Sequence, residues 1–310
     1  MNAIETEGLT KAYRTHFGRS APPSLDKLTL TVPENQIFGF LGRNGAGKTT
    51  TIKSLCGLIR PSSGSARIFG VDVRRRKARK LIGYLPENPY FYEYLSPRET
   101  LDFYGLLAGL HAGERDAEWN KLADLLDLRD IADKRIREFS KGMRQRVGFA
   151  VAMVGSPRVL ILDEPMSGLD PLGRRKIREV ILYARDQGAT VFFSSHVLAD
   201  VQQICDRIAI LNRGKLVVEG RMGDLLSRKT EEIEVVLGHI DDQTHARIAE
   251  TANRSRRSED GRHYYFATSE NALSAVRTAL ENNGILVEYI PVRESLEDYF
   301  VRLETEAAER

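Results

Sequence analysis

Short apolar runs alternate with helical patterns along residues 1–226, which is typical of an α/β domain with a mostly parallel sheet. Three runs are continuously apolar, as strands buried on both faces are: 36–42, 159–163 and 189–195. A further segment, 207–220, predicts a hairpin that turns at residues 212–214. The pattern therefore predicts a central sheet whose strands come from the whole of this region.

One helix between these strands has clear end signals. Asp170 is a suitable N-cap, Pro171 falls at the first helical position, and Gly188 is expected to stop the helix. The loop 167–170 in front of this helix lies where it could touch a neighbouring subunit.

Residues 88–157 carry helical patterns without a strong strand signal. Ser96 and Glu99 form a capping box with Pro97 at the first helical position, so we expect a helix to begin there. Two more helical segments follow, and the second begins near Ser140. We interpret this stretch as a helical subdomain inserted into the α/β core.

The pattern changes again after residue 227. Alternation with period two at 231–237 predicts a strand, and further strands and helices follow in short succession up to a last helix near 295–303. The chain is therefore expected to consist of one domain at 1–227 and a small α+β domain at 228–310. The charged segment 228–232 is the expected linker.

Composition narrows the class of protein. The 310 residues are 29% charged with a net charge of +3, which does not indicate a nucleic-acid-binding protein. The basic run 74–80 has two interpretations: a solvated helix face, or a contact with anionic lipid headgroups.

Two cysteines are too few for a disulfide framework and fit a reducing compartment. The N-terminus lacks the apolar segment of a secretory signal, and no window of 18 apolar residues exists, so we expect a chain that does not cross a membrane by itself.

A glycine-rich segment between an apolar strand and a helix carries the clearest chemistry. Residues 42–49 read GRNGAGKT and fit the pattern G-x-x-x-x-G-K-[ST]. The glycines let successive backbone N–H groups point into one concavity, Lys48 reaches the β- and γ-phosphates, and the Thr49 hydroxyl ligates Mg²⁺. The segment predicts a nucleoside triphosphate site, and alone it would serve a kinase, a GTPase or a motor equally well.

Acidic residues follow the apolar run at 159–163. We call the glycine-rich segment 42–49 the cradle. In parallel sheets, a carboxylate at the carboxyl end of a buried strand lies beside such a phosphate-binding segment. Asp163 is thus expected to hold Mg²⁺ directly or through water, and Glu164 to orient and polarise the attacking water. The alternative is a strand that merely ends in two acids.

Two further side chains have both a structural and a functional interpretation. His196 follows the apolar run 189–195, where it would contact the γ-phosphate or be a hydrogen-bonded structural residue. Tyr13, in a strand-like region near the N-terminus, would stack on adenine or be a surface residue.

A second anion-binding pattern stands about a hundred residues after the cradle. Ser140 and Gly142 lie at a predicted helix start, in the segment FSKGMRQR, and helix N-termini favour anions. One chain contains no second nucleotide motif that this site could serve, whereas a second copy of the chain would.

The ordered segments GRNGAGKT, FSKGMRQR, VLILDEP, SGLD and SSH resemble the motifs of the ATP-binding cassette (ABC) ATPases of transporters, over residues 1–226. The resemblance implies a P-loop NTPase (RecA-like) core with an N-terminal antiparallel β subdomain, the inserted helical subdomain and the small C-terminal α+β domain. It further implies ATP and Mg²⁺ as ligands and head-to-tail pairing of two cassettes, most simply a homodimer, in which Ser140 and Gly142 contact ATP held by the partner.

The same resemblance assigns the site residues. It implies Lys48, Glu164 and His196 as catalytic residues and Thr49, Asp163 and Glu87 around the metal. Nucleotide contacts are implied for Tyr13, Gly42, Asn44, Gly45, Ala46, Gly47, Lys48, Thr49, Thr50, Glu87, Ser140, Gly142 and Asp170.

Three departures from the family pattern are visible. Two departures lie in the family's signature motif, residues 139–143: Lys141 and Met143 replace the usual Gly and Gln. The third is Glu87, which replaces a usual Gln in the loop after residue 85; unlike Gln, its carboxylate cannot donate a hydrogen bond. The segment 14–23 also makes a longer loop after Tyr13 than is usual.

The changes at Glu87, Lys141 and Met143 resemble an exporter subclass whose membrane subunit is a separate polypeptide, and residues 294–300 resemble its tail domain. The expected protein is therefore peripheral at the cytoplasmic face of the cell membrane, bound to a permease. The aromatic stretch 90–94 is expected to line the groove for that permease or to belong to the subdomain core. Alternatives are an importer cassette and a soluble family member that acts in DNA repair or on ribosomes, although no sustained heptads indicate the coiled coil typical of the latter.

Overall fold

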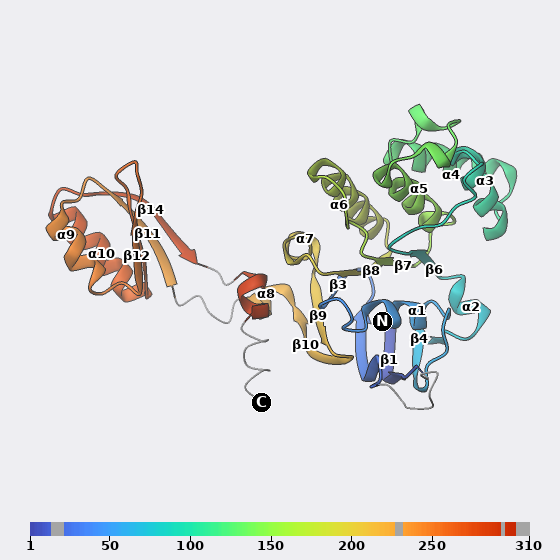
Figure 1. The fold of residues 1–310 in the computed structure, drawn as a ribbon, viewed down its shortest axis with the longest axis horizontal. Helices are drawn as coiled ribbons and strands as arrows, with labels where there is room; N and C mark the ends of the chain where they lie inside the picture. The colour runs from blue at the N-terminus through green and yellow to red at the C-terminus, as the bar shows by residue number, and fades with distance from the viewer. Residues whose placement is uncertain (14–21, 227–231, 293–294, 302–310) are drawn as a thin grey trace. The chain divides into compact units, whose positions relative to one another are not determined.

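The computed structural model describes residues 1–13, 22–226, 232–292 and 295–301. The chain divides into two compact units, Met1–Met222 and Gly223–Arg310 (Figure 1). Helix α8 (Met222–Leu226) begins where the first unit ends. The expected boundary at 227/228 and nearly all of the expected linker lie outside the described residues.

A six-stranded sheet forms the centre of the first unit, with the strand order β10-β9-β3-β8-β7-β6. Neighbouring strands are parallel except in the β9–β10 hairpin. The strands are β3 (Ile37–Leu41), β6 (Ile82–Leu85), β7 (Val159–Asp163), β8 (Thr190–Ser195), β9 (Arg207–Asn212) and β10 (Lys215–Arg221). Every residue of β3, β7 and β8 is buried, which explains why their sequences show no polar alternation.

A second sheet, antiparallel and of order β2-β1-β4-β5, confirms the expected N-terminal β subdomain. Its strands are β1 (Asn2–Lys11), β2 (Leu25–Pro33), β4 (Ser63–Ile68) and β5 (Val71–Asp72). Helix α1 (Lys48–Leu55) buries Ile52 and Leu55 in a hydrophobic cluster that also contains Ile4 of β1 and Phe40 of β3. The helix that follows the glycine-rich loop is therefore held between the two sheets (Figure 1).

Helices α6 (Pro171–Asp186) and α7 (Leu198–Ile204) contact β3 and β8 of the central sheet. As predicted, α6 begins at an Asp170 N-cap with Pro171 in its first turn, and the chain turns away at Gly188. The charged run contains the short helix α2 (Arg76–Arg79), which buries only Ala78, and in front of it Arg74 forms an ion pair with Asp72. Contact of this run with lipid stays a hypothesis.

The helical subdomain contains α3 (Pro97–Ala108), α4 (Ala112–Leu125) and α5 (Lys141–Met153), with 3₁₀ turns at Arg129–Ile131 and Ile136–Glu138. The predicted capping box of Ser96 and Glu99 is present. Helix α5 approaches β6 so closely that a Cβ on Gly83 would lie 1.9 Å from the carbonyl oxygen of Ala152. Backbone-to-backbone packing thus fixes α5 against the central sheet.

The C-terminal unit is a four-stranded antiparallel sheet of order β12-β13-β11-β14. Its elements are β11 (Glu232–Gly238), α9 (Asp242–Ala249), β12 (Arg254–Arg257), β13 (His263–Ala267), α10 (Ser269–Glu281) and β14 (Ile285–Val292), and a last helix begins at residue 296. Both α9 and α10 cover the same face of the sheet, where their apolar residues share a core with β11 and β13 (Figure 1). Strand β12 is absent from the predicted elements because its sequence, RSRR, has no apolar position.

Within the described ranges, no helix combines the length and the apolar character needed to cross a bilayer.

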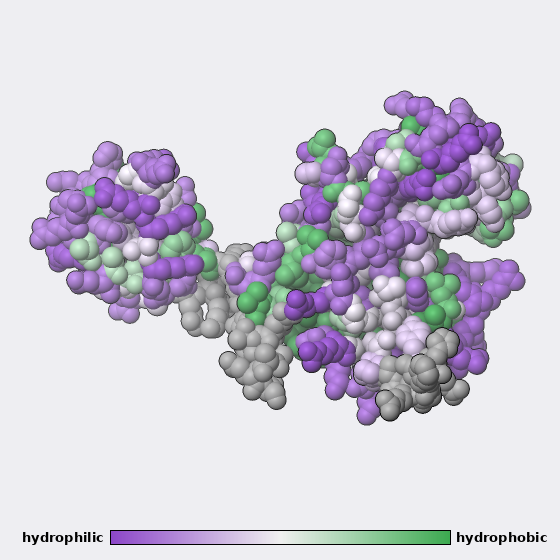
Figure 2. Space-filling model, in the orientation of Figure 1, coloured by the Kyte–Doolittle hydropathy of each residue, from purple (hydrophilic) through white to green (hydrophobic). Residues whose placement is uncertain are grey.

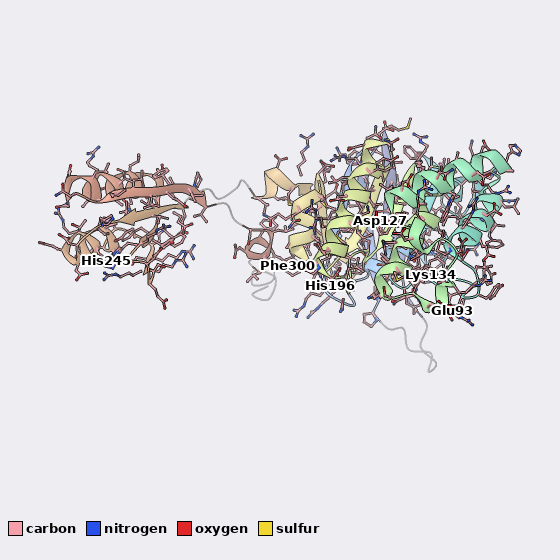
Figure 3. The ribbon with its side chains drawn as sticks, turned by 90° about the horizontal axis from the view of Figure 1, so that it is seen from above. Glu93, Asp127, Lys134, His196, His245 and Phe300 are labelled. Atoms are coloured by element: carbon pink, nitrogen blue, oxygen red, sulfur yellow. The ribbon has the colours of Figure 1, made fainter. Side chains whose placement is uncertain are left out.

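Two histidines and a tyrosine form a cluster in the C-terminal unit, where Figure 3 labels His245. His245 Nδ1 on α9 lies 2.5 Å from the Tyr265 hydroxyl and 3.2 Å from His263 Nδ1 on β13, while Arg257 and Asp242 form an ion pair close by. His263 is only 1% exposed. Burial and the neighbouring His245 lower the pKa of His263 below its usual value of 6.5. Only one proton fits between the two facing Nδ1 atoms.

The C-terminal unit is therefore expected to lose stability in acid. Below a pH of about 6.5 the unfolded chain binds a proton that folded His263 resists, so stability is complete above that pH and falls as the pH drops through it. Hydrogen exchange in peptides from β11 and β13, corrected for intrinsic rates, should speed up between pH 7.5 and 5.5. His263→Gln should flatten this response, and His239→Gln, which changes an exposed histidine, should leave it unchanged. An equal acid response in His263→Gln would show that His263 is not the titrating group.

Candidate active site

The glycine-rich loop 42–47 joins β3 to α1 at the carboxyl edge of the central sheet. Gly47 is the N-cap of α1 with φ 109°, and a Cβ there would lie 2.4 Å from the carbonyl oxygen of Ser24. Only glycine fits this position, because side chains rarely adopt such a φ and the backbone of residue 24 fills the space. The loop leaves Asn44 and Gly45 exposed and Ala46 buried, while Thr49 is exposed and Thr50 partly exposed in the first turn of α1. This arrangement presents a helix N-terminus to an anion.

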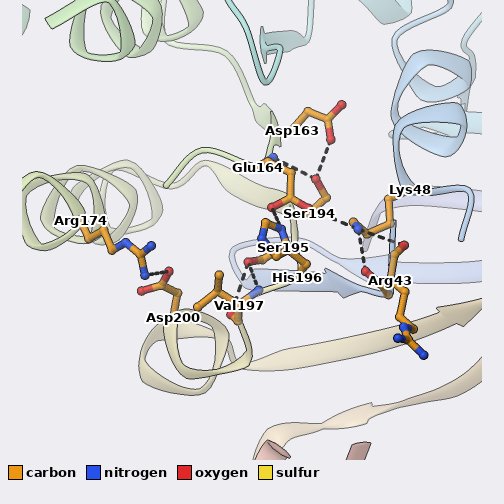
Figure 4. A network of polar contacts seen from close by, with 11 residues as sticks. Arg43, Lys48, Asp163, Glu164, Arg174, Ser194, Ser195, His196, Val197 and Asp200 are labelled. Atoms are coloured by element: carbon orange, nitrogen blue, oxygen red, sulfur yellow. Dashed lines mark hydrogen bonds and ion pairs between the residues drawn. The ribbon is translucent and has the colours of Figure 1, made fainter. Parts of the chain in front are cut away.

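Lys48 is buried, with 6% of its side chain exposed, at the base of this loop (Figure 4). Its ammonium donates hydrogen bonds to the carbonyl oxygens of Gly42 at 2.6 Å and Arg43 at 3.4 Å. It also lies 3.3 Å from Glu164 Oε1. The cation is thus held at the cradle by groups that an entering triphosphate can replace.

Asp163 and Glu164 lie at the end of β7, and Ser194 on the neighbouring strand β8 fixes both. The Ser194 hydroxyl donates to Asp163 Oδ1 at 2.7 Å and accepts from the backbone N–H of Glu164 at 3.0 Å (Figure 4). Ser194 was missed in the sequence. The one available signal is a hydroxyl residue in a strand that is otherwise expected to be wholly buried.

Glu164 is held in a specific orientation. Its backbone has φ 49°, a left-handed conformation that non-glycine residues rarely adopt. Its carboxylate bridges Lys48, through Oε1, and His196, whose Nδ1 lies 2.8 Å from Oε2. The structure therefore brings together Lys48, Glu164 and His196, the three residues that were predicted to be catalytic. The side chain of His196 is half-exposed.

A buried glutamine links helix α5, which begins after Ser140, to this site. Gln145 on α5 is 2% exposed and donates from Nε2 to the carbonyl oxygen of Pro165 at 2.9 Å. The helix that begins at Ser140 is thus tied to the loop that follows Glu164. No pattern in the sequence indicates this contact, because a glutamine in a helix is normally solvated.

Ser140 caps α5, as predicted, and its hydroxyl accepts from the backbone N–H of Met143 at 3.3 Å. Together with Gly142 and Asp170 it lines a pocket of about 540 Å³ between the N-terminal ends of α5 and α6. Lys141 also lines this pocket, and its side chain lies over Gly168. None of residues 42–50, and neither Glu164 nor His196, is among the described residues that line it. The pocket at Ser140 is thus separate from the glycine-rich loop of the same chain.

The remaining predicted residues lie at the surface. Tyr13 is 46% exposed and follows β1, which ends at Lys11, so it is not in the strand; the Lys11 ammonium lies 5.1 Å from its ring centre. The long loop expected after Tyr13 falls mainly on residues 14–21, outside the described residues. Glu87 is exposed in the loop after β6. Asp170 uses Oδ1 to cap α6, accepting from the Gly173 N–H at 2.7 Å.

The loop after β3, the acidic pair at the end of β7 two strands away in the same sheet, and the inserted helical subdomain define a P-loop ATPase of the ATP-binding cassette type. A family model described as "ABC transporter" matches residues 25–167. An uncharacterized ABC transporter ATP-binding protein of Synechocystis sp. is 43% identical over 304 residues, which cover 97% of this chain and 84% of that protein. The bacitracin transport ATP-binding protein BcrA of Bacillus licheniformis is 37% identical over 310 residues, 97% of this chain and 96% of that protein.

A solved structure of the ATP binding subunit of an ABC transporter matches with a TM-score of 0.65 at 31% identity, and the match covers 72% of this chain and 91% of that one. The chain belongs to the family of ABC transporter ATP-binding proteins. It is the ATP-binding, ATP-hydrolysing subunit of a transporter, which confirms the expected fold and enzyme class.

Proposed function

We propose that two copies of this chain form the ATPase pair of an exporter, and that each ATP is held between the cradle of one copy and Ser140 and Gly142 of the other. The observation that carries this proposal is the separation of the two anion sites. Within one chain the pocket at Ser140 shares no lining residue with the cradle, so its helix N-terminus needs a phosphate from elsewhere. A second copy supplies that phosphate, and ATP binding then drives closure because the closed pair gains these contacts.

The cradle residues have distinct roles in hydrolysis. Lys48 exchanges its carbonyl and Glu164 contacts for phosphate oxygens and stabilises the charge that develops on the transferred phosphoryl group. Glu164, once released from Lys48, accepts a hydrogen bond from the attacking water and orients it. His196 contacts the γ-phosphate from the end of β8 and holds Glu164 through Nδ1. Tyr13, Asn44 and Thr50 complete the contacts of the cradle, and Asp170 contributes from the pocket at Ser140 of the opposite copy.

The donor set fits Mg²⁺, which prefers oxygen ligands and keeps several waters. Thr49 offers an exposed hydroxyl, and Asp163 a buried carboxylate of which Oδ1 is oriented by Ser194. The described residues contain no group of three or more His, Cys, Asp and Glu side chains that could enclose an ion, so phosphate and water would complete the shell. Thr49, Asp163 and, from the loop after β6, Glu87 would hold Mg²⁺, which neutralises phosphate charge when bound.

The partner is a separate permease at the cytoplasmic face of the membrane. Tyr90, Tyr92 and Tyr94 are 87%, 48% and 65% exposed, and the rings of Tyr92 and Tyr94 lie 5.9 Å apart. Exposed, neighbouring aromatics of this kind favour a partner helix over the alternative that the stretch belongs to the core, although Phe91 between them is buried. The match along nearly its whole length to BcrA, a bacitracin transport ATP-binding protein, supports a role in transport, and the departures at Glu87, Lys141 and Met143 favour export.

Co-purification tests the partner. A tagged chain, isolated in mild detergent from cells that express its genomic neighbours, is expected to carry one integral membrane protein. The double variant Tyr90→Ala/Tyr94→Ala should lose that protein and keep its affinity for ATP. Leu280→Ala removes an apolar side chain that is 56% exposed in the C-terminal unit and serves as the control. A chain that stays in the soluble fraction without any membrane protein would favour the soluble ATPase of the same family.

A further inference from the structure

The two edges of the C-terminal sheet differ in character. At one edge, β12 reads RSRR and all four residues are exposed; Arg254 forms an ion pair with Glu232, and Arg257 with Asp242. At the other edge, β14 reads ILVEYIPV, with Glu288 as its one charged residue. Soluble proteins protect the unpaired backbone groups of edge strands with charge, bulges or cover. Edge β12 is charged along most of its length, whereas the protection of β14 is limited to Glu288, a register irregularity at residues 286–288 and Pro291 near its end.

Strand β14 is also unusually apolar for an exposed strand. Five of its large hydrophobic side chains are 36–51% exposed: Ile285, Leu286, Val287, Tyr289 and Ile290. The register irregularity at residues 286–288 interrupts the alternation of faces, but Tyr289 and Ile290 lie on opposite faces, so both faces are incompletely covered. Figure 2 shows hydrophobic surface on this unit where Figure 1 has β14. Within the described residues, β14 pairs only with β11, and its other edge has no strand beside it.

We propose that β14 pairs antiparallel with β14 of a second copy and joins the two C-terminal sheets into one of eight strands. A strand that pairs with its own counterpart closes after two copies, whereas β14 on β12 would continue into an open chain of subunits. The three arginines of β12 prevent the second arrangement, and the low charge of β14 permits the first. A two-fold axis perpendicular to the sheet would relate the two β14 strands, so one residue of β14 would lie directly opposite the same residue of the other copy. Glu288 is excluded there, because two carboxylates would meet.

The stability of this strand pairing depends on the proposed function, in which ATP brings two copies of the chain together. One strand pair buries far less than the roughly 1,000 Å² of a stable interface, so free C-terminal units would associate weakly. When ATP brings two cassettes together, the two C-terminal units are confined at an effective concentration that reaches the millimolar range for short linkers. The C-terminal unit would then lengthen the lifetime of the ATP-bound pair without touching the nucleotide.

Disulfide scanning of the full-length chain tests the pairing directly. Variants that each add one cysteine at residues 285–290 are oxidised with and without ATP in the Glu164→Gln background, and Ser255→Cys on β12 is the matched edge control. The two native cysteines, Cys56 and Cys205, are buried, and burial raises the pKa of both thiols, so they react slowly. Paired strands bring facing Cα atoms within about 5.5 Å, which a disulfide spans.

We expect a cross-linked dimer at one or two of the six positions and none at residue 255. ATP should increase the yield of this dimer at least about tenfold, because it raises the effective concentration of the C-terminal units. Cross-linking at β14 without an ATP-dependent dimer would support strand pairing and contradict the proposed function. An ATP-dependent dimer without cross-links at any β14 position, or with equal cross-linking at residue 255, would overturn the strand pairing and leave the proposed function intact. Thermal unfolding of each variant confirms that it folds.

Discussion

Glu164→Gln is expected to lower ATP turnover by at least about 100-fold and to accumulate a dimer that forms only with ATP. The substitution keeps the size of the side chain and removes the negative charge that bridges Lys48 and His196. The neutral amide can still accept a hydrogen bond, but it polarises the attacking water far less than the carboxylate does, so hydrolysis slows. Binding should not weaken, because Lys48 no longer has to leave a carboxylate in order to reach the phosphates.

Steady-state ATPase assays and size-exclusion chromatography with and without ATP measure both effects. The control is Glu179→Gln, which removes an exposed carboxylate of α6 that pairs only with Arg175 among the ion pairs of the described residues. It should behave like the unchanged protein. A Glu164→Gln chain that remains monomeric and hydrolyses ATP at the original rate is incompatible with the composite site.

The buried strands were predictable because burial on both faces leaves an unbroken apolar run. Strands β3, β7 and β8 have this pattern, and the residues just beyond their carboxyl ends, such as Glu164 and His196, were predictable from the strand ends alone. Strand β12 has no such signal, because its backbone bonds to β13 while all of its side chains face solvent. Its strand conformation is imposed by the tertiary fold.

The residues that orient the candidate site were harder to predict than those proposed to carry its chemistry. Ser194 acts through two hydrogen bonds and Gln145 through one, all to groups that lie 20 to 31 residues away in sequence. No motif marks such contacts, since their meaning depends on which strands and helices become neighbours. The separation of the Ser140 pocket from the cradle is likewise a property of the three-dimensional fold, and it is this separation that calls for a second copy.

Mixing two inactive variants is expected to restore activity. Lys48→Ala removes the cation of the cradle, and Gly142→Asp places a carboxylate where the partner's phosphate is expected. At Gly142 a Cβ meets only Leu169 Cδ2, at an ordinary 3.7 Å, and an acidic residue in the first turn of α5 suits the helix dipole, so folding should not suffer. Each variant alone has two defective sites per pair and should show under about 1% of the original turnover.

A mixed pair has a different distribution of defects. The Gly142→Asp chain contributes an intact cradle, and the Lys48→Ala chain contributes an intact Ser140 and Gly142 to that same ATP, so one of the two sites is complete. Random pairing of equal amounts makes half of the pairs mixed, and independent sites then return about a quarter of the original activity. ATPase assays and nucleotide trapping on the mixture measure this recovery. A site formed within one chain predicts no recovery in either assay, because each chain would still carry its own defect.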